Sequence, residues 1–439
     1  MGYYLVWGLG ISGMSAIDFL LSKGKKVKVY DDDKTKLFDL RAKNLLINCV
    51  VESKLNKTTL LGVECVVLSP TVRIDKRIKK IITALGIKIM SEFSLASFFN
   101  PAPLYCVTGT NGKTTTVNML QAMLSSCGQA YLVGNVGTPF TSVVSKINSG
   151  DSVVAEVSNF QLENMDGVIA NAVAITNIAP DHLDMYSSFT EYIKAKHNIM
   201  SVVQSKKVFL NYDEEILREW GDGRSEYFSL KPLPNDKNGI FVNNGEIYQQ
   251  QNGVYEKLMD LPPLKSRHNV ANFLCAMSLA LYAGVSVEQI SNATRSFVLP
   301  RHRQEIVKIK DGITFVNDSK ATNIHAVKSA LENFKESRII LLLGGSDKGE
   351  DYAAFLSKIP SNVKCVVTFG ALHKKLSAIL KREKKAYHDC GDVFEAVNTS
   401  INIAKTGDVV LFSPGGASFD EFTSYSERGD YFCELVNEI

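Results

Sequence analysis

The sequence of 439 residues predicts an α/β protein of three domains built on mostly parallel sheets. Short apolar segments repeatedly end in turns of glycine and polar residues, and amphipathic segments follow them. Two of these turns, "GLGISG" and "GTNGKTT", have the spacing of loops that bind phosphate groups. A chain of this length is expected to form two or three separate cores. We expect the domains to span residues 1–94, 95–299 and 300–439.

The composition excludes several classes of protein. Hydrophobic residues make up 45% and charged residues 22% of the chain, as in a soluble globular protein. A net charge of only +3 gives no support for a nucleic-acid partner. We expect no membrane span, because no uninterrupted run of 18 apolar residues occurs, and no signal peptide, because the start of the chain lacks a basic leader and contains Asp18. The eight cysteines are scattered without a C-x-x-C pair, which predicts buried thiols in a reducing cytoplasm.

The first domain begins with a strand, a glycine-rich turn and a helix. The pattern predicts parallel strands at residues 3–7, 26–30 and 65–69, and a helix over 15–24 that Gly24 closes. Glycines 8, 10 and 13 follow the first strand and Asp31 follows the second, which is the Rossmann arrangement. Three interpretations remain open here: an NAD site, a tight turn without a ligand, or a site for a different diphosphate.

The second domain opens with a phosphate-binding loop. "PLYCVTGTNGKTTTVNML" predicts a strand over 104–107, a loop over 108–113 and a helix from Thr114. Backbone N–H groups around the loop glycines can cradle phosphate oxygens, while Lys113 adds a positive charge and Thr114 offers a hydroxyl to Mg²⁺. Val107 stands where the common form of this loop has its first glycine. ATP binding is nevertheless better supported than NAD binding.

Two later segments of this domain add candidate functional groups. A strand that ends in Glu156 would place a carboxylate at the edge of the sheet where Mg²⁺-nucleotide binds, although a solvent-facing acid is the alternative. A further strand, 173–175, leads to a loop that holds His182, either a structural histidine or a ligand. The next helix starts with a capping box from Ser188 to Glu191. Tyr192 and Lys196 are four residues apart and would share one face of that helix.

The third domain repeats one pattern three times. Strands in the segments 314–323, 340–351 and 409–422 each end in a polar turn that contains glycine or small residues. In doubly wound sheets such turns carry the ligand. Arg303, Lys320 and Lys348 could therefore gather around anionic groups, although each alone reads as an ordinary surface charge.

Taken together, these motifs resemble the Mur ligases, cytoplasmic enzymes of peptidoglycan synthesis that use ATP to join an amino acid to the carboxylate of a UDP-sugar. The resemblance covers essentially the whole chain and rests on "TGTNGKTTT", the Glu156 strand, "DHLDMY" with Lys196, "RHNVANF", "PRHRQE" and "NDSKATN". "GLGISG", "GNVGTP", "SNFQLE" and "GGSDKG" are most similar to the member that adds D-glutamate. The alternatives are the member that adds L-alanine and, less well supported, a nicotinamide-dependent dehydrogenase, which would leave the phosphate loop unexplained.

The resemblance implies why one chain carries two glycine-rich turns. The Rossmann-like first domain would hold the UDP end of the sugar nucleotide, the central P-loop domain would hold ATP, and the Rossmann-like C-terminal domain would hold the amino acid. The implied reaction adds D-glutamate to the L-alanyl carboxylate of UDP-N-acetylmuramoyl-L-alanine through an acyl phosphate, and gives ADP and phosphate. It implies ATP and two Mg²⁺ ions as cofactors, and a cytoplasmic monomer with no nucleic-acid or membrane partner.

The resemblance also implies roles for individual residues. Those expected to bind ATP are Gly109, Thr110, Asn111, Gly112, Lys113, Thr114, Thr115, Asn272, Arg303 and Asp318. Those expected to bind the UDP-sugar are Gly10, Ile11, Ser12, Asp31, Asn135, Ser158, Gln161 and His182. Those expected to bind D-glutamate are Thr322, Lys348, Ser418 and Tyr425, with Lys320 near the reacting groups.

The implied metal ligands are Thr114 and Glu156 for one Mg²⁺, and His182 and Lys196 for the second. In this interpretation Lys196 is carbamylated, which turns a cation into an anion that can hold a metal. The alternative is a surface lysine paired with Glu191 or Asp184. The implied catalytic residues are Lys113, Glu156, His182, Lys196 and Lys320.

Overall fold

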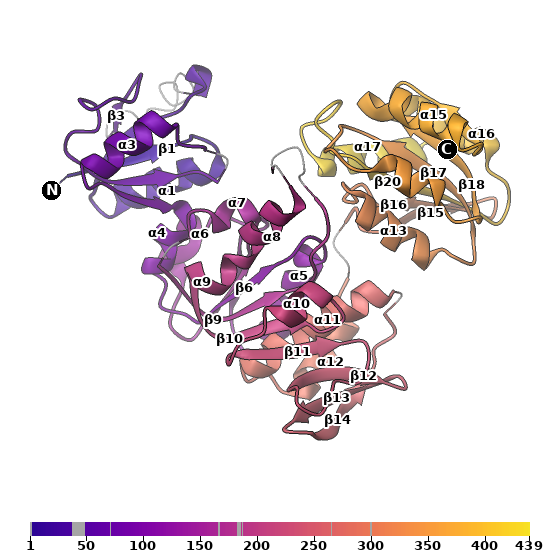
Figure 1. Cartoon of the computed structure of the whole chain (residues 1–439), viewed down its shortest axis with the longest axis horizontal. Helices are drawn as coiled ribbons and strands as arrows, with labels where there is room; N and C mark the ends of the chain where they lie inside the picture. Colours follow the sequence, from indigo (N-terminus) through magenta and orange to yellow (C-terminus); the bar gives the residue numbers. More distant parts are fainter. Residues whose placement is uncertain are drawn as a thin grey trace. The chain divides into compact units, whose positions relative to one another are not determined.

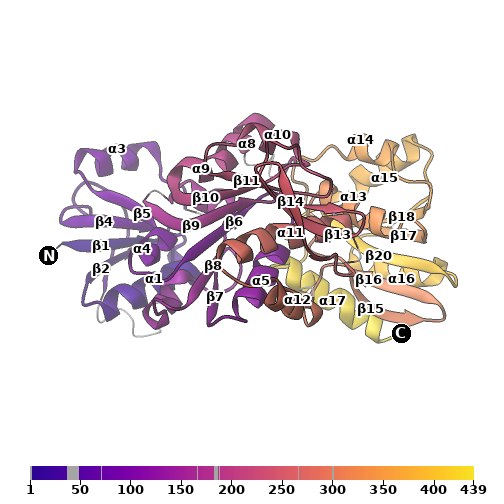
Figure 2. The same ribbon diagram turned by 90° about the horizontal axis from the view of Figure 1, so that it is seen from below.

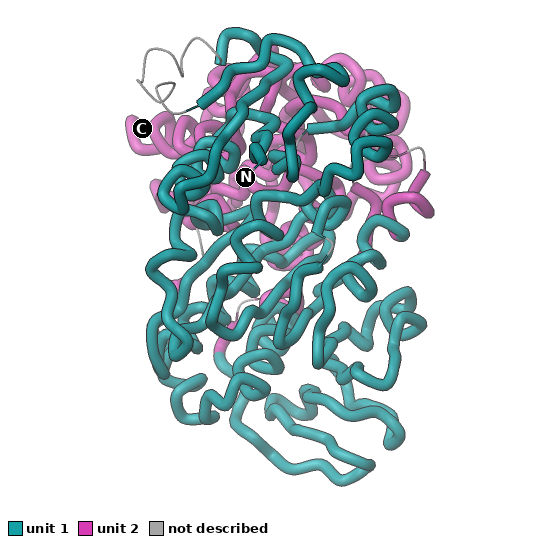
Figure 3. The backbone as a smooth tube through the Cα atoms, turned by 90° about the vertical axis from the view of Figure 1, so that its left-hand side faces the viewer, with its two compact units in different colours: residues 1–177, 194–262, 270–297 teal, residues 178–193, 263–269, 298–439 magenta. Residues whose placement is uncertain are grey.

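A computed structural model describes residues 2–36, 49–70, 72–165, 167–181, 186, 188–264, 266–298 and 301–439. Within these residues the strands form three sheets, of five, nine and six strands, with helices packed on them (Figures 1 and 2). The chain divides into two compact units (Figure 3). Unit 1 comprises residues 1–177, 194–262 and 270–297, and unit 2 comprises residues 178–193, 263–269 and 298–439. The α/β class predicted from the sequence is confirmed, and the three domain boundaries stay a prediction.

The first sheet of unit 1 is parallel throughout, with the order β3-β2-β1-β4-β5. Its strands are β1 (Tyr3–Trp7), β2 (Lys26–Tyr30), β3 (Cys49–Val51), β4 (Val63–Leu68) and β5 (Lys88–Ser91). The described helices of this part include α1 (Ile11–Ser22), α3 (Lys76–Ala84) and α4 (Glu92–Phe98). The predicted strands at 3–7 and 26–30 are confirmed. The helix begins at Ile11 and not at residue 15: Ser12 and Gly13, which weaken the helical pattern of the sequence, are helical in the structure.

The second sheet of unit 1 has the order β14-β13-β12-β11-β10-β9-β6-β8-β7. The strands are β6 (Leu104–Thr108), β7 (Ala130–Gly134), β8 (Ser152–Glu156), β9 (Val168–Ile175), β10 (Val203–Asn211), β11 (Ser225–Ser229), β12 (Gly239–Asn243), β13 (Glu246–Gln251) and β14 (Val254–Asp260). In Figure 2, α5 (Lys113–Leu124), α11 (Arg267–Tyr282) and α12 (Val287–Arg295) lie on one face of this sheet. Helices α9 (Ile199–Val202) and α10 (Glu215–Glu219) lie on the other (Figure 2). Short helices α6 (Phe140–Val143) and α7 (Asn159–Leu162) follow β7 and β8.

Two antiparallel hairpins extend this sheet at the β14 edge. The sequence analysis did not predict them, although the signal was present. Asn244–Gly245 and Asn252–Gly253 occupy the two turns, and all four residues have positive φ angles. Asn-Gly is the pair that two-residue hairpin turns prefer, because both central residues of such turns need a left-handed backbone.

The sheet of unit 2 has the order β15-β16-β20-β17-β18-β19. Its strands are β15 (Glu305–Lys310), β16 (Ile313–Asn317), β17 (Arg338–Gly344), β18 (Val363–Phe369), β19 (Tyr387–Asp389) and β20 (Asp408–Gly415). Helices α13 (Ile324–Asn333), α14 (Tyr352–Ser357) and α15 (His373–Arg382) cover one face, and α16 (Val393–Ile403) and α17 (Tyr425–Asn437) cover the other (Figure 2). Alternate residues of β17 enter the two cores, which is why "IILLL" is apolar throughout.

Sheet order brings the predicted ligand loops together within each unit. In unit 1, β6 lies between β8 and β9, so the loop after β6 adjoins the ends of both neighbours. In unit 2, β20 lies between β16 and β17, and all three strands run parallel. The three polar turns predicted in the third domain therefore lie at one edge of one sheet. Within the described ranges, no helix is both long enough and apolar enough to cross a bilayer.

Candidate active site

The phosphate loop follows β6 with the backbone that its glycines permit. Gly109 and Gly112 have φ angles of +144° and +83°. A Cβ on Gly109 would lie 2.0 Å from Thr176 Oγ1, and one on Gly112 would lie 2.1 Å from Asn272 Oδ1. Both glycines are therefore required by conformation and by close packing. Asn272, predicted to contact adenine, lies directly against the loop.

Two residues that the sequence analysis gave no role, Thr176 and Asn177, hold this loop from the end of β9. Thr176 Oγ1 and Asn177 Nδ2 donate to the carbonyl oxygen of Asn111 at 2.6 and 2.9 Å. The Asn111 N–H in turn donates to Asn177 Oδ1 at 2.9 Å. The available signal was their place directly after a predicted strand, which becomes informative only once β9 is known to pair with β6.

The loop has the groups that a nucleotide phosphate needs. Lys113 Nζ lies over it and donates to the carbonyl oxygens of Gly109 and Thr110 at 2.9 and 2.8 Å. Helix α5 begins at Lys113, and Gly112 before it has no side chain to cap the helix. The positive end of the helix and its first N–H groups thus adjoin the ammonium group, a combination that favours bound anions. These residues fit the triphosphate of ATP.

Glu156, at the end of β8, joins two other predicted site residues. Its Oε2 accepts from Thr114 Oγ1 at 2.7 Å, and its Oε1 accepts from Asn135 Nδ2 at 2.8 Å. The residue is only 2% exposed and β8 is an inner strand, so the solvent-facing alternative is wrong. A carboxylate and a hydroxyl at this separation are hard oxygen ligands of the kind that Mg²⁺ binds. The donor set therefore fits one Mg²⁺ ion.

The helix α8 (Phe189–His197) carries Lys196. Lys196 and Tyr192, one turn apart, are each 1% exposed. The alternative of a surface lysine is therefore wrong. One of the two hydrogen bonds of the predicted capping box is among the described contacts: the Glu191 N–H donates to Ser188 Oγ at 3.2 Å. His182 and Asp184 lie outside the described residues.

The glycine turn after β1 is fixed by packing at two of its three glycines. Gly8 has a φ angle of +95°, and a Cβ on Gly13 would lie 1.8 Å from the Gly8 carbonyl oxygen. A Cβ on Gly10 would meet nothing within 4 Å, so the space beside Gly10 is open. Asp31 is 7% exposed and accepts from the Leu9 and Asp33 N–H groups at 2.6 and 2.8 Å. Its carboxylate thus stabilises the turn itself.

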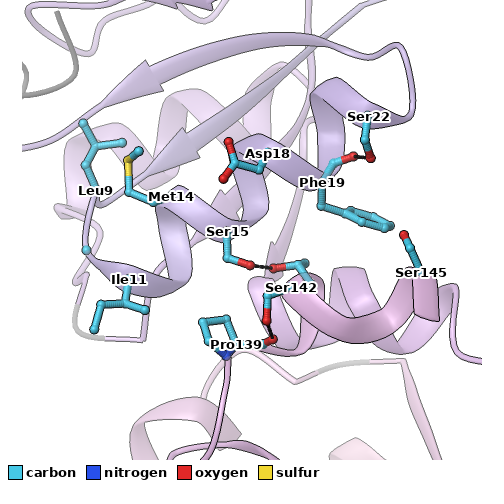
Figure 4. Close-up of a pocket in the computed structure, with 12 residues that line it drawn as sticks. Leu9, Ile11, Met14, Ser15, Asp18, Phe19, Ser22, Pro139, Ser142 and Ser145 are labelled. Carbon is cyan, nitrogen blue, oxygen red and sulfur yellow. Dashed lines mark hydrogen bonds between the residues drawn. The ribbon is translucent and has the colours of Figure 1, made fainter. Parts of the chain in front are cut away.

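A cavity of about 810 Å³ runs between α1 and α6, and Gly10 and Ile11 line it (Figure 4). Ser12, the third predicted residue of this turn, is not among its lining residues. Ser15 on α1 shares a 2.7 Å hydrogen bond with Thr141 on α6. The N–H and hydroxyl of Thr141 both donate to the buried Glu92 carboxylate, at 2.6 and 2.7 Å. This network connects the glycine turn to the segment that follows β7.

Ser158 and Gln161 bond to one another. The Gln161 N–H donates to Ser158 Oγ at 3.3 Å, and the Ser158 N–H donates to Gln161 Oε1 at 2.9 Å. This capping box starts α7 immediately after β8. The two side chains are buried, and they lie just beyond Glu156 in the chain.

In unit 2, the structure pairs predicted residues with each other and with residues that were not predicted. Lys320 Nζ donates to the Tyr425 hydroxyl at 3.0 Å and lies 4.8 Å from the ring centroid. Lys348 Nζ forms a 3.0 Å ion pair with Asp181 Oδ1, and Asn323 Nδ2 donates to Asp181 Oδ2 at 3.3 Å. Ser418, which is 2% exposed, and Thr322 lie on the neighbouring loops after β20 and β16. Asp181 and Asn323 had no assigned role.

Two carboxyl groups of unit 2 have raised pKa values. Burial raises the pKa of Asp318 to about 7, against the opposing effects of a Ser413 hydrogen bond and the Arg303 guanidinium. Ser413 Oγ donates to Asp318 Oδ2 at 2.8 Å. Burial, with a contribution from Asp181, also raises the pKa of Glu350 to about 7, although Lys348 opposes the shift. Arg303 and Asp318, both predicted nucleotide contacts, thus lie close enough to interact.

Three family models match successive parts of the chain. The MurD-like N-terminal domain of Mur ligases matches residues 3–91, the Mur ligase middle domain matches 107–280, and the glutamate ligase domain of Mur ligases matches 302–416. UDP-N-acetylmuramoylalanine–D-glutamate ligase of Thermoanaerobacter pseudethanolicus is 36% identical over 99% of this chain and 98% of its own. The chain belongs to the Mur ligase family. The dehydrogenase alternative is therefore wrong.

A further relative shares the name of the first, and two solved structures share the fold of this Mur ligase. A protein of the same name from Caldanaerobacter subterraneus is 35% identical over 99% of this chain and 98% of its own. Among solved structures, a pseudomurein peptide ligase type C from Methanothermus fervidus aligns with a TM-score of 0.64 and 19% identity over the whole of both chains. The ligase MurC from Thermotoga maritima aligns with a TM-score of 0.59 and 19% identity over 100% of this chain and 99% of its own. These two likenesses concern the fold.

Proposed function

We propose that this Mur ligase adds D-glutamate to the L-alanyl carboxylate of UDP-N-acetylmuramoyl-L-alanine, using ATP and releasing ADP and phosphate in peptidoglycan synthesis. The observation that carries the proposal is 36% identity over nearly the whole chain to relatives that bear the name of this reaction. The phosphate loop with the adjoining Glu156–Thr114 pair supports ATP and Mg²⁺ as its cofactors. The L-alanine-adding alternative lacks a relative of comparable identity among those described above.

The reaction has two bond-forming steps. An oxygen of the L-alanyl carboxylate attacks the γ-phosphorus of ATP, and the bond to ADP breaks, which gives an acyl phosphate. The amine of D-glutamate then attacks the acyl carbon, loses a proton, and expels phosphate as the amide forms. Both steps crowd anions together, so positioning and charge neutralisation supply most of the catalysis.

Unit 1 supplies most of the groups that hold the two nucleotides in this proposal. In the proposal, Gly10, Ile11, Ser12 and Asp31 receive the UDP end, and Asn135, Ser158 and Gln161 orient the muramoyl-alanine. Lys113 and the N–H groups of residues 109–115 neutralise the β- and γ-phosphates, and Asn272 contacts adenine. The bonds from Thr176 and Asn177 to Asn111 keep this loop in one conformation.

Magnesium, when bound, neutralises part of the negative charge of the phosphates. Thr114 and Glu156 would hold one ion, and His182 and carbamylated Lys196 a second. The burial of Lys196 supports this assignment, because a buried ammonium group is costly and favours the neutral amine that reacts with CO₂. Carbamylation of Lys196 replaces one N–H bond of its amine with an N–C bond to CO₂ and releases a proton.

Unit 2 supplies the acceptor groups. In the proposal, Thr322, Lys348, Ser418 and Tyr425 bind D-glutamate. Lys320 stays close to Tyr425 and offsets charge at the reacting atoms. Arg303 and Asp318 contact the phosphate and ribose of ATP. We further propose that the enzyme is a monomer in the cytoplasm.

A direct test offers three labelled amino acids to the purified protein with ATP, Mg²⁺ and the matching UDP-sugar acceptors. We expect label from D-glutamate, and not from L-alanine or meso-diaminopimelate, to enter the nucleotide product with stoichiometric release of phosphate. Incorporation of L-alanine into UDP-N-acetylmuramate would support the alternative ligase. Absence of any incorporation would contradict the proposed function.

A further inference from the structure

A buried arginine of α17 has no place in the roles assigned so far. Arg428 is 1% exposed and is among the largest fully buried side chains of the chain. Its guanidinium donates to Ser319 Oγ at 3.1 Å, to the Ser319 carbonyl oxygen at 2.9 Å and to that of Ala417 at 2.9 Å. It also donates from two nitrogens to the Gly416 carbonyl oxygen, each at 3.2 Å. Its hydrogen-bond partners are thus backbone carbonyls and one hydroxyl.

The charge of Arg428 is not matched by an ion pair within the described ranges. Burial lowers its pKa to about 10, although Asp420 and Glu421 act in the opposite direction. The group therefore remains a cation at neutral pH. Burying an unpaired charge is unfavourable, and an apolar side chain could fill the same volume. What only arginine provides is a rigid planar fork with five N–H donors.

The carbonyls that this fork holds belong to two loops of the proposed acceptor site. Ser319 directly precedes Lys320, on the loop after β16, and Ala417 directly precedes Ser418, on the loop after β20. Ser319 Oγ also donates to the carbonyl oxygen of Tyr425, at 2.8 Å, which fixes the first residue of α17 to the same point. Arg428 thus connects the backbones that carry Lys320, Ser418 and Tyr425.

The third loop is tied to the same residues. Ser346 and Ala417 exchange two backbone hydrogen bonds, of 2.8 and 3.0 Å, so the loop after β17 is joined to the loop after β20. Lys348 follows two residues later. A Cβ on Gly345 would lie 2.8 Å from Arg428 Nη1, which shows how closely the guanidinium packs between these loops.

We propose that Arg428 is the positioning residue of the acceptor site: its guanidinium sets the spacing of the three loops that present Lys320, Ser418 and Lys348 to D-glutamate. The inference rests on the proposed function, because it assumes that these loops bind the acceptor. Arg428 acts through the loop backbones and does not itself touch the substrate. Its loss should therefore weaken the use of D-glutamate selectively.

The test compares Arg428→Lys with wild type. Lysine keeps the positive charge but lacks the planar fork, so it cannot bond Ser319, Gly416 and Ala417 at once. We expect the KM for D-glutamate to rise at least tenfold, with the KM values for ATP and the UDP-sugar within threefold of wild type. Arg382→Lys, at an exposed arginine of α15, is the matched control and should leave all three KM values unchanged.

The following outcomes separate the possibilities. A KM for D-glutamate within threefold of wild type, or an equal rise in all three KM values, would overturn the inference. If Arg428→Lys fails to fold, Ser319→Ala replaces it in the test, because this variant removes one guanidinium acceptor and the bond to Tyr425. We expect Ser319→Ala to raise the KM for D-glutamate at least threefold. No rise would overturn the inference. Wild-type protein that does not incorporate D-glutamate would instead refute the proposed function.

Discussion

Replacing Lys348 by methionine should separate a structural role from a binding role. Lys348 Nζ and Asp181 Oδ1 are 3.0 Å apart, and their side chains are 11% and 8% exposed. Removing one partner of a buried ion pair typically costs about 3–5 kcal/mol. Because both groups retain some exposure, we expect Lys348→Met to lower the free energy of unfolding by about 3 kcal/mol.

The same substitution should also weaken D-glutamate binding. A charge-assisted hydrogen bond to a carboxylate contributes about 1.5–3 kcal/mol. Its loss should therefore raise the KM for D-glutamate by roughly 10- to 150-fold, with little change in the KM for ATP. The double variant Lys348→Met/Asp181→Asn also removes the carboxylate charge at residue 181, while the new amide oxygen can still accept from Asn323. We expect it to recover about 2 kcal/mol of the lost stability and none of the lost affinity.

Urea unfolding of the wild type, Lys348→Met, Asp181→Asn and the double variant measures the free energy of unfolding. Initial rates of phosphate release at increasing D-glutamate concentration measure the KM for D-glutamate. A double variant as unstable as Lys348→Met would show that the pair with Asp181 does not carry the stability. A KM for D-glutamate that returns to the wild-type value in the double variant would refute Lys348 as its ligand. A larger rise in the KM for ATP would place Lys348 in the nucleotide site.

Three further predictions follow from the same geometry. Lys113→Ala should remove roughly 3–5 kcal/mol of transition-state stabilisation and so nearly abolish ligation. UDP-sugar binding, measured by calorimetry, should stay intact. Unchanged turnover would refute the assignment of this loop to ATP. Lys196→Ala and Lys196→Arg should both be nearly inactive, with partial rescue of the alanine variant by a small carboxylic acid, whereas an active arginine variant would contradict carbamylation. Asp318 has its pKa raised from 3.8 to about 7, so the native state binds more protons than the unfolded state between these values and stability falls as pH rises through that window. Urea unfolding of Asp318→Asn at pH 4 and pH 8 should show a pH dependence smaller by up to about 4 kcal/mol, and an unchanged dependence would refute the shift.

Where local sequence decides local structure, the sequence-based predictions agree with the fold. The strands at 3–7 and 26–30 are short apolar runs bounded by turn residues, and both are present. The start of α1 was placed too late, because glycine and serine after the turn weaken the helical pattern at residues 11–14. The hairpins of β12 to β14 were missed although their two Asn-Gly turns are a local signal.

For the candidate site, the sequence analysis found many of the chemical groups but few of the residues that hold them. Glu156 was chosen for its place at the end of a strand, and its contacts with Thr114 and Asn135 agree with that choice. Thr176 and Asn177 bond Asn111 from 65 and 66 residues away, and their place directly after a predicted strand does not by itself indicate this contact. Their role depends on β9 pairing with β6.

The sequence by itself determined the phosphate loop, because the glycine positions, the lysine and the following helix are set by residues within one short segment. It also determined the apolar strands and the polar turns after them. Only the tertiary structure decided which turns meet. Arg428 bonds Ser319 across 109 residues, and Lys348 pairs with Asp181 across 167. Periodicity specifies which segments become strands and helices, but the order of strands in a sheet comes from burying all their apolar faces at once, so contacts between distant loops are fixed only when the whole core has formed.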